Sequence, residues 1–236
     1  YYGTLLIAGL AAAIGFGLFF FLGGDAFSSL LGLLSPPAYD LRLWHLAAGI
    51  VLGILAAPVG LLFPVLTKVL GRLVAPLNGQ PVIRGTLGGL LLGLLAVVLP
   101  ITVGLGTTEM ATVNQQAAEI GVVLLVVFAL AKLLALSGAL SFGFIGGPIF
   151  PLLFIGSTLG TAINLLFPQL PLGLTVGCMT VAVPATVAPI PLALAVIGIV
   201  VIGLPLTNAI PVVLASLVAF ATVRGLVMPA GGNKKT

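Results

Sequence analysis

Charged residues are scarce in this chain, and so are the residue types that build catalytic and metal sites. Only 5% of the 236 residues are charged, whereas charged residues make up about a quarter of a soluble domain. The chain therefore lacks the residues that would cover a surface facing water. One histidine, one cysteine and four acidic residues form no nucleophile–base spacing and no cluster of metal ligands. We expect no catalytic residues, no metal site and no cofactor, and hence no enzyme.

The lone cysteine argues against an internal disulfide, and the small basic charge argues against a nucleic-acid-binding protein. Cys178 has no second cysteine with which to form a disulfide within the chain, and its expected role is that of a small buried apolar residue. The net charge of +4 gives no sign of a nucleic-acid partner. Basic residues gather at one apparent loop and at the C-terminal end: Lys68, Arg72, Arg84, Arg224, Lys234 and Lys235. By the positive-inside tendency, both regions are expected on the cytoplasmic side.

Apolar residues are abundant, at 61% of the chain, and the mean hydropathy is +1.38. Apolar runs long enough to cross roughly 30 Å of hydrocarbon recur from end to end. They are not the short alternating segments of a membrane β-barrel. The sequence therefore predicts an all-α integral membrane protein that crosses the bilayer several times, and we expect it in the cell membrane.

The runs predict helices that become shorter and more broken toward the C-terminus. The expected long helical segments are residues 4–22, 44–73, 84–100, 120–140 and 149–166. Pro58 and Pro64 are expected to kink or break the second segment. Gly85, Gly89 and Gly93 form a stripe that would let a neighbouring helix approach closely. Seven closely spaced prolines after the last segment predict re-entrant pieces, which are tolerated only inside protein or beside water.

The stretch "IGGPIFPLLFIGSTLG", residues 145–160, interrupts the hydrophobic pattern. Gly146 and Gly147 allow a tight turn with bare backbone, and Pro148 and Pro151 lie where the first turn of a helix tolerates proline. A helix that begins inside the membrane directs free N–H groups and the positive end of its dipole into a medium of low dielectric. Such a helix start can bind an anion without a charged side chain. The simpler interpretation is a turn between two helices.

These residues are similar to those of a known family. The stretch "GGPIFPLLFIGSTLGTA" resembles the signature of the CLC chloride channels and proton-coupled anion exchangers. The likeness continues through "AKLLALSGALSFGFIGG", "LFPQLPL", "VAPIPLALAVIGIVV" and "LGLLSPPAYDLRLWHLAAGIVLGILAAPVG". It implies a multi-helix bundle with broken and re-entrant helices that transports a small inorganic anion, which we expect to be chloride.

The resemblance reaches only the second of the two inverted repeats in a CLC subunit. We expect residues 1–236 to form one transmembrane domain, with a leading helix at 1–24, the repeat at 34–225 and a polar tail at 226–236. The other half is then expected from a separate chain, from a removed N-terminal region, or from a second copy in inverted orientation. The first residue, Tyr1, fits a fragment or a processed chain. An oligomer in the lipid bilayer is expected in each case.

The resemblance also implies which residues form the anion site. The backbone amides of Gly147, Ile149 and Phe150 are expected to bind the anion. Gly146, Pro148 and Pro151 are expected to shape the site. Ile149 stands where the family motif has its phenylalanine. Pro148 lacks an N–H where the motif has a donor. The family's gating glutamate and pore tyrosine have no counterpart in these 236 residues.

Two other functions stay open from the residues. A non-conducting membrane scaffold or assembly subunit would keep the fold without a working site, which Pro148 favours. A secondary transporter for another substrate would need polar groups that converge on an unwound segment, and "TTEMATVNQQ", residues 107–116, is the candidate. His45 and Lys132 are interpreted as boundary and packing residues.

Overall fold

The part of the chain that the structure describes is built from helices. This computed structural model describes residues 2–28 and 34–227 and contains no strand in those ranges. The α-helices are α1 (Tyr2–Ser28), α2 (Leu43–Val74), α3 (Pro81–Val98), α4 (Thr107–Gln115), α5 (Ala117–Phe142), α6 (Ile149–Leu166), α7 (Leu172–Ala185), α8 (Pro191–Ile202) and α9 (Ala209–Val227). The 3-10 helices are η1 (Ala75–Leu77), η2 (Pro100–Thr102) and η3 (Leu206–Asn208). The all-α prediction is confirmed. Of the predicted polar tail, residues 228–236 lie outside the described residues.

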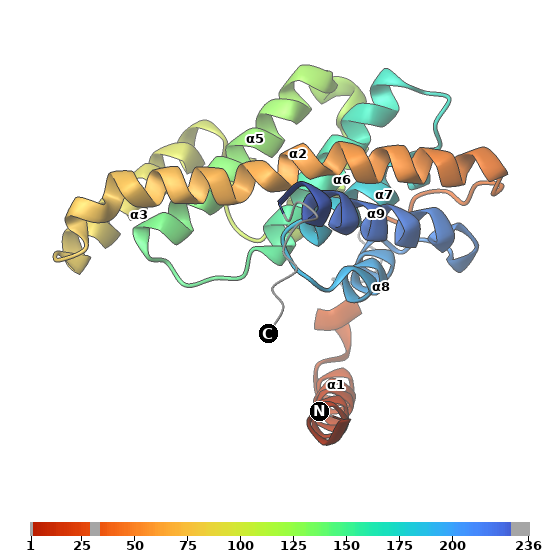
Figure 1. The fold of residues 1–236 in the computed structure, drawn as a ribbon, viewed down its shortest axis with the longest axis horizontal. Helices are drawn as coiled ribbons and strands as arrows, with labels where there is room; N and C mark the ends of the chain where they lie inside the picture. Colours follow the sequence, from red (N-terminus) through yellow and green to blue (C-terminus); the bar gives the residue numbers. More distant parts are fainter. Residues whose placement is uncertain (1, 29–33, 228–236) are drawn as a thin grey trace, which may run out of the picture.

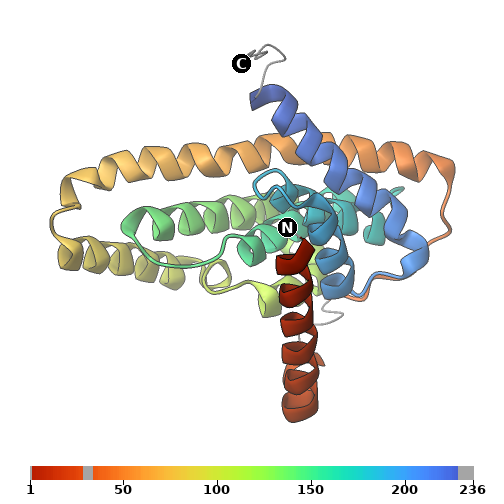
Figure 2. The ribbon, with the colours of Figure 1, turned by 60° about the horizontal axis from the view of Figure 1, so that its bottom comes forward.

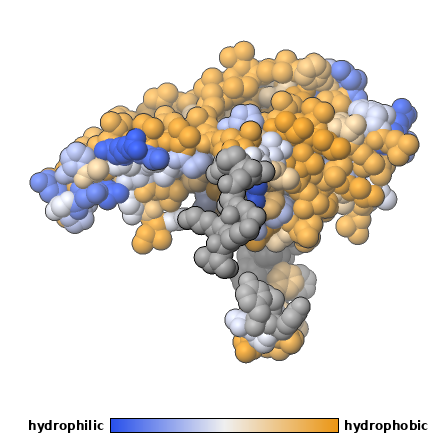
Figure 3. All heavy atoms as spheres, in the orientation of Figure 1, coloured by the Kyte–Doolittle hydropathy of each residue, from blue (hydrophilic) through white to orange (hydrophobic). Residues whose placement is uncertain are grey.

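Several of these helices can cross a membrane. In the described ranges, five helical stretches are long and apolar enough: Leu43–Leu77, Pro81–Val98, Ala117–Phe142, Ile149–Leu166 and Leu206–Leu226. Hydrophilic residues gather at the two ends of the long axis, and the face between them is mostly hydrophobic (Figure 3). This hydrophobic face is therefore suited to contact the hydrocarbon of a bilayer. The protein is an integral membrane protein with several spans, as the sequence predicts.

The core of the bundle is formed by α6 and α7. Figures 1 and 2 show these helices among α2, α5 and α9, whereas α1 stands apart from the rest. Every residue of α7 from Gly173 to Ala185 is buried. Gly156 allows α6 to approach α7, because a Cβ at this position would lie 2.3 Å from the carbonyl oxygen of Met179. Gly160 makes the same approach one turn later, and Gly49 and Gly53 do so between α2 and α9. This is the close packing that four-residue spacing of small residues permits.

The predicted glycine stripe on α3 has no such role. Around Gly85, Gly89 and Gly93, no atom lies within 4 Å of the position that a Cβ would take. The packed glycine of this helix is Gly88, which meets the side chain of Phe142 instead. The stripe prediction is wrong because spacing alone does not say which face of a helix meets a neighbour.

The two prolines of the second predicted segment do not break it. Pro58 and Pro64 lie inside α2, which continues through both of them to Val74. Figure 1 shows α2 as one long helix along the whole molecule. Proline is tolerated in membrane helices where neighbouring groups satisfy the freed backbone. The prediction of a break is therefore wrong.

A buried asparagine fixes the segment that precedes α2. Asn208 in η3 is fully buried, donates from Nδ2 to the Tyr39 carbonyl oxygen at 2.7 Å, and accepts from the Tyr39 N–H at 3.4 Å. Burial also raises the pKa of the Tyr39 phenol. The amide thus closes a contact between positions 169 residues apart.

Replacing Asn208 with leucine is expected to lower the free energy of unfolding by about 1–3 kcal/mol, because it leaves the Tyr39 carbonyl without a donor. Thermal unfolding of the purified chain in detergent measures this effect. Asn78→Leu is the matched control, since the side chain of Asn78 bonds Arg84 at an exposed site. Equal losses in the two variants would show that Asn208 does not hold this segment.

Candidate functional site

The segment between α5 and α6 is shaped by glycine at one end and proline at the other. Gly143 ends α5 with a left-handed φ of 96°. Its N–H donates to Leu140 O at 3.1 Å, and the Phe144 N–H donates to Ala139 O at 3.0 Å. These are the bonds of a glycine-terminated helix end. The chain then runs without helix until Pro148, which caps α6. The predicted helix at 149–166 coincides with α6.

This segment carries α6 back into the molecule before the helix starts. In Figures 1 and 2, residues 143–148 run from the end of α5 toward the middle of the long axis, where α6 begins. Since the long axis runs between the two hydrophilic ends, the start of α6 lies at depth in the hydrophobic zone. A turn that simply joins two spanning helices would instead lie at one end of the molecule.

Among the residues that the structure describes, no acceptor bonds two of the backbone donors in the first turn of α6. The N–H groups of a helix's first turn have no intrahelical acceptor. The first bond of this helix runs from the Leu152 N–H to Pro148 O at 3.0 Å. Pro148 and Pro151 have no N–H, so the donors of this turn belong to Ile149 and Phe150.

The predicted site residues lie together at this start, on an open face. Gly146 and Gly147 are exposed, Pro148 and Ile149 are partly buried, and Pro151 is buried. Phe150 is 36% exposed, and the preceding Ile145 is fully exposed. The contribution of the Gly147 amide stays a prediction. Within this chain the helix start is therefore a surface, which a second body would have to cover to enclose an ion.

A buried lysine lies close to this helix start. Lys132 in the middle of α5 is only 2% exposed. Its ammonium group donates to the carbonyl oxygens of Val103 at 3.2 Å and Gly104 at 2.8 Å. It also lies 5.1 Å from the ring centroid of Phe154. These direct partners are neutral, and the carboxylate of Glu109 is close enough to interact electrostatically with the ammonium group.

Lys132 and Pro151 line one small cavity of about 160 Å³, together with Thr102 and Gly104. The Lys132 side chain therefore lies at the same cavity as the first turn of α6. Our sequence interpretation made Lys132 a packing residue and missed this relation. The signal was present, because an ionisable residue inside an apolar span marks a functional site by default.

The polar stretch before α5 packs against α6 rather than forming an unwound site. Residues 107–115 are helical, although the sequence suggested an irregular segment. Asn114 donates from Nδ2 to the Ser157 hydroxyl at 3.0 Å, and the Thr161 hydroxyl donates to Asn114 Oδ1 at 2.6 Å. These bonds join α4 to the middle of α6, so they support the helix whose start forms the site.

Comparison with known proteins identifies the fold. The family model described as voltage gated chloride channel matches residues 2–224. The chain belongs to this family. Membership of the voltage gated chloride channel family agrees with the resemblance found in the sequence.

Two kinds of relative support the assignment to the voltage gated chloride channel family. A solved structure of a CLC-type fluoride/proton antiporter is similar with a TM-score of 0.67 and 27% identity, over 82% of this chain and 48% of the antiporter chain. The proteins named "Putative ion-transport protein YfeO" from Salmonella typhimurium and Salmonella dublin are each 34% identical over 147 residues, which are 59% of this chain and 34% of the relative. The chain thus spans about half of the antiporter and about a third of the curated relatives.

Proposed function

We propose that this chain supplies half of a pathway for a small inorganic anion, as part of a channel or an exchanger. The observation that carries the proposal is the start of α6 at depth in the hydrophobic zone, with the N–H groups of Ile149 and Phe150 free. The positive end of the helix dipole and two donors favour an anion there. Partial charges hold an ion weakly enough to release it, as conduction requires.

The open face of the site supports the half-subunit role. Phe150 and the glycines before it are exposed, although an ion inside a membrane needs donors on all sides in place of its water. We propose that a complementary half, or an inverted second copy of this chain, covers the start of α6.

The transported ion is proposed to be chloride. The family description names chloride, whereas the solved relative is described as a fluoride/proton antiporter. The two N–H donors and the cationic Lys132 favour a monovalent anion without selecting between halides by geometry alone. A flux assay with each ion separates the two.

Reconstitution in liposomes tests the function. The chain is purified together with its complementary half, and the efflux of chloride and of fluoride is followed with ion-selective electrodes. We expect chloride efflux above that of empty vesicles. Efflux of fluoride alone would overturn the choice of chloride, and the absence of both would overturn anion transport and leave the scaffold.

Pro148 provides a sharper test, because it is the feature that favours a scaffold. Pro148→Ala is expected to tighten halide binding by about tenfold, since it adds one N–H donor beside those of Ile149 and Phe150. Isothermal titration with chloride on the assembled protein measures the change. Pro171→Ala is the matched control, because Pro171 also directly precedes a helix. Unchanged affinity in Pro148→Ala would show that the donors are assigned to the wrong residues.

A further inference from the structure

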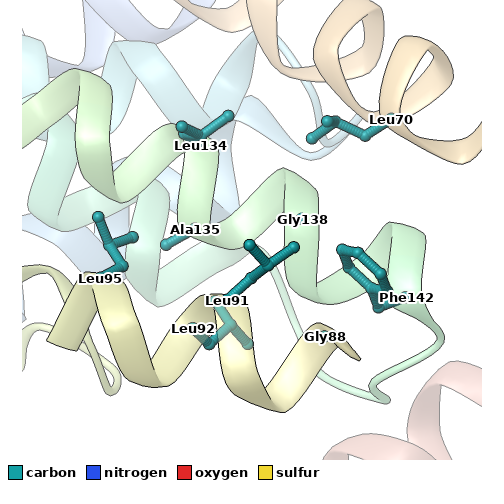
Figure 4. Close-up of a pocket in the computed structure, with 9 residues that line it drawn as sticks. All are labelled: Leu70, Gly88, Leu91, Leu92, Leu95, Leu134, Ala135, Gly138 and Phe142. Atoms are coloured by element: carbon teal, nitrogen blue, oxygen red, sulfur yellow. The ribbon is translucent and has the colours of Figure 1, made fainter. Parts of the chain in front are cut away.

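An apolar cavity of about 260 Å³ lies between α2, α3 and α5. Figure 4 shows Leu70 of α2, Leu91 and Leu95 of α3, and Leu134 and Phe142 of α5 around it. All nine lining residues are apolar or glycine. The volume is just below the roughly 300 Å³ at which pockets begin to hold drug-sized ligands. A segment of one hydrocarbon chain suits both its size and its chemistry.

A second, polar cleft adjoins this cavity at Phe142. It is also about 260 Å³ and is lined by Arg84 and Gly85 of α3, by Phe142, and by Gly143 and Phe144 after it. Arg84 and the cavity residue Gly88 are four residues apart, so they share one face of α3. The guanidinium therefore lies just beyond one end of the apolar cavity.

The guanidinium of Arg84 has no acidic partner among its hydrogen-bond acceptors, and not all of its N–H donors are bonded. Its Nη1 donates to Asn78 Oδ1 at 2.9 Å, and its Nη2 donates to the Ser141 carbonyl oxygen. Both partners are neutral, and Nε is buried without a partner among the described residues. A guanidinium with unused donors binds oxyanions such as phosphate in a two-pronged geometry.

The surroundings add positive charge at the same end of the molecule. Lys68 and Arg72 are exposed on the last turns of α2, and α3 begins soon after them in the chain, at Pro81. Figure 3 shows hydrophilic residues gathered where α2 ends and α3 begins. Basic residues at a membrane surface attract anionic lipid headgroups.

We propose that an anionic phospholipid binds at this place, with its phosphate at Arg84 and one acyl chain in the cavity between α3 and α5. The apolar cavity selects a lipid over free phosphate, because the phosphate alone would leave that cavity unfilled. Arg84 also bonds Ser141, next to the segment that leads to α6, so the lipid would brace the approach to that helix. This proposal does not depend on anion transport.

Lipid titration of the protein tests the proposal. The chain, assembled with its complementary half in neutral detergent, is titrated with phosphatidylglycerol and with phosphatidylcholine, and bound lipid is counted by native mass spectrometry. We expect phosphatidylglycerol to bind about fivefold more tightly, the preference that one basic residue confers. Arg84→Gln should remove this preference, whereas Arg224→Gln, in the last turn of α9, should retain it.

A second variant tests the acyl chain. Gly138 lines the cavity, and no atom lies within 4 Å of its Cβ position, so Gly138→Leu should fold while filling the space. We expect Gly138→Leu to weaken the binding of both phosphatidylglycerol and phosphatidylcholine. Gly89→Leu, which lies outside the cavity, is its control. Equal loss of preference in Arg84→Gln and Arg224→Gln would overturn the proposal. So would unchanged lipid binding in Gly138→Leu, or an assembled protein that binds no lipid because the other half fills the cavity.

Discussion

Gly156→Val is expected to prevent α6 and α7 from packing and to cost about 3 kcal/mol or more, the upper range for an overfilled core. A Cβ on Gly156 would lie 2.3 Å from Met179 O and 2.8 Å from the Thr180 Cα. Both are backbone atoms of a buried helix and cannot turn aside as a flexible side chain can. The helices would have to separate at the centre of the bundle, where interiors are packed as densely as crystals.

The matched control for this substitution is Gly89→Val. Gly89 also lies inside a helix, but its Cβ position has no atom within 4 Å, so the same change in helix propensity occurs without a clash. Thermal unfolding and the fraction of monodisperse protein in detergent measure both variants. A Gly156→Val protein as stable as Gly89→Val would show that α6 and α7 do not approach as closely as the structure has them.

Lys132→Met is expected to weaken halide binding at the start of α6 by about tenfold. The ammonium group is almost fully buried and lines a cavity that Pro151 of the first α6 turn also lines. At a separation of about 10 Å, a unit charge in general contributes about 1.7 kcal/mol at an effective dielectric of about 20. Methionine has a similar length and keeps the packing, but it leaves the carbonyls of Val103 and Gly104 without their donor.

Two comparisons separate the charge from the packing. Lys132→Arg keeps the charge and should retain most of the affinity, and Lys68→Met removes an exposed lysine and should change it little. Chloride titration of the assembled protein gives the affinities, and unfolding curves report the structural cost. If the arginine variant loses as much affinity as the methionine variant, the geometry of residues 103–104 controls binding and the charge does not.

Elements whose ends are marked by local chemistry were predictable from the sequence. The limits of α6 were predicted correctly because Pro148 and Pro151 suit a first turn, and the pair Phe167 and Pro168 follows its last residue. The membrane class was predictable too, since composition alone decides it. The continuation of α2 through Pro58 and Pro64 was not predictable, because it depends on what surrounds α2 rather than on the prolines themselves.

The site was predictable in position but not in its surroundings. The glycine–proline stretch located the start of α6, and the loss of a donor at Pro148 followed from its chemistry. The placement of Lys132 did not follow, because its bonds reach residues 28 and 29 positions away. Gly104 takes a left-handed backbone there, and such a turn depends on tertiary packing. Which glycine of α3 packs against α5 was not predictable either, because it depends on the face that α3 turns toward α5.

The shortness of α7 has a consequence for biosynthesis. Its 14 residues span about 21 Å at 1.5 Å per residue, less than the roughly 30 Å of hydrocarbon. Its free backbone ends therefore cannot rest among lipids, where each unpaired group costs several kcal/mol. They need protein around them, and α9, one of the helices packed against α7, is translated after it. We therefore expect α7 to reach its place only after the translocon has released α9, so that α7 inserts late and together with the helices that pack against it.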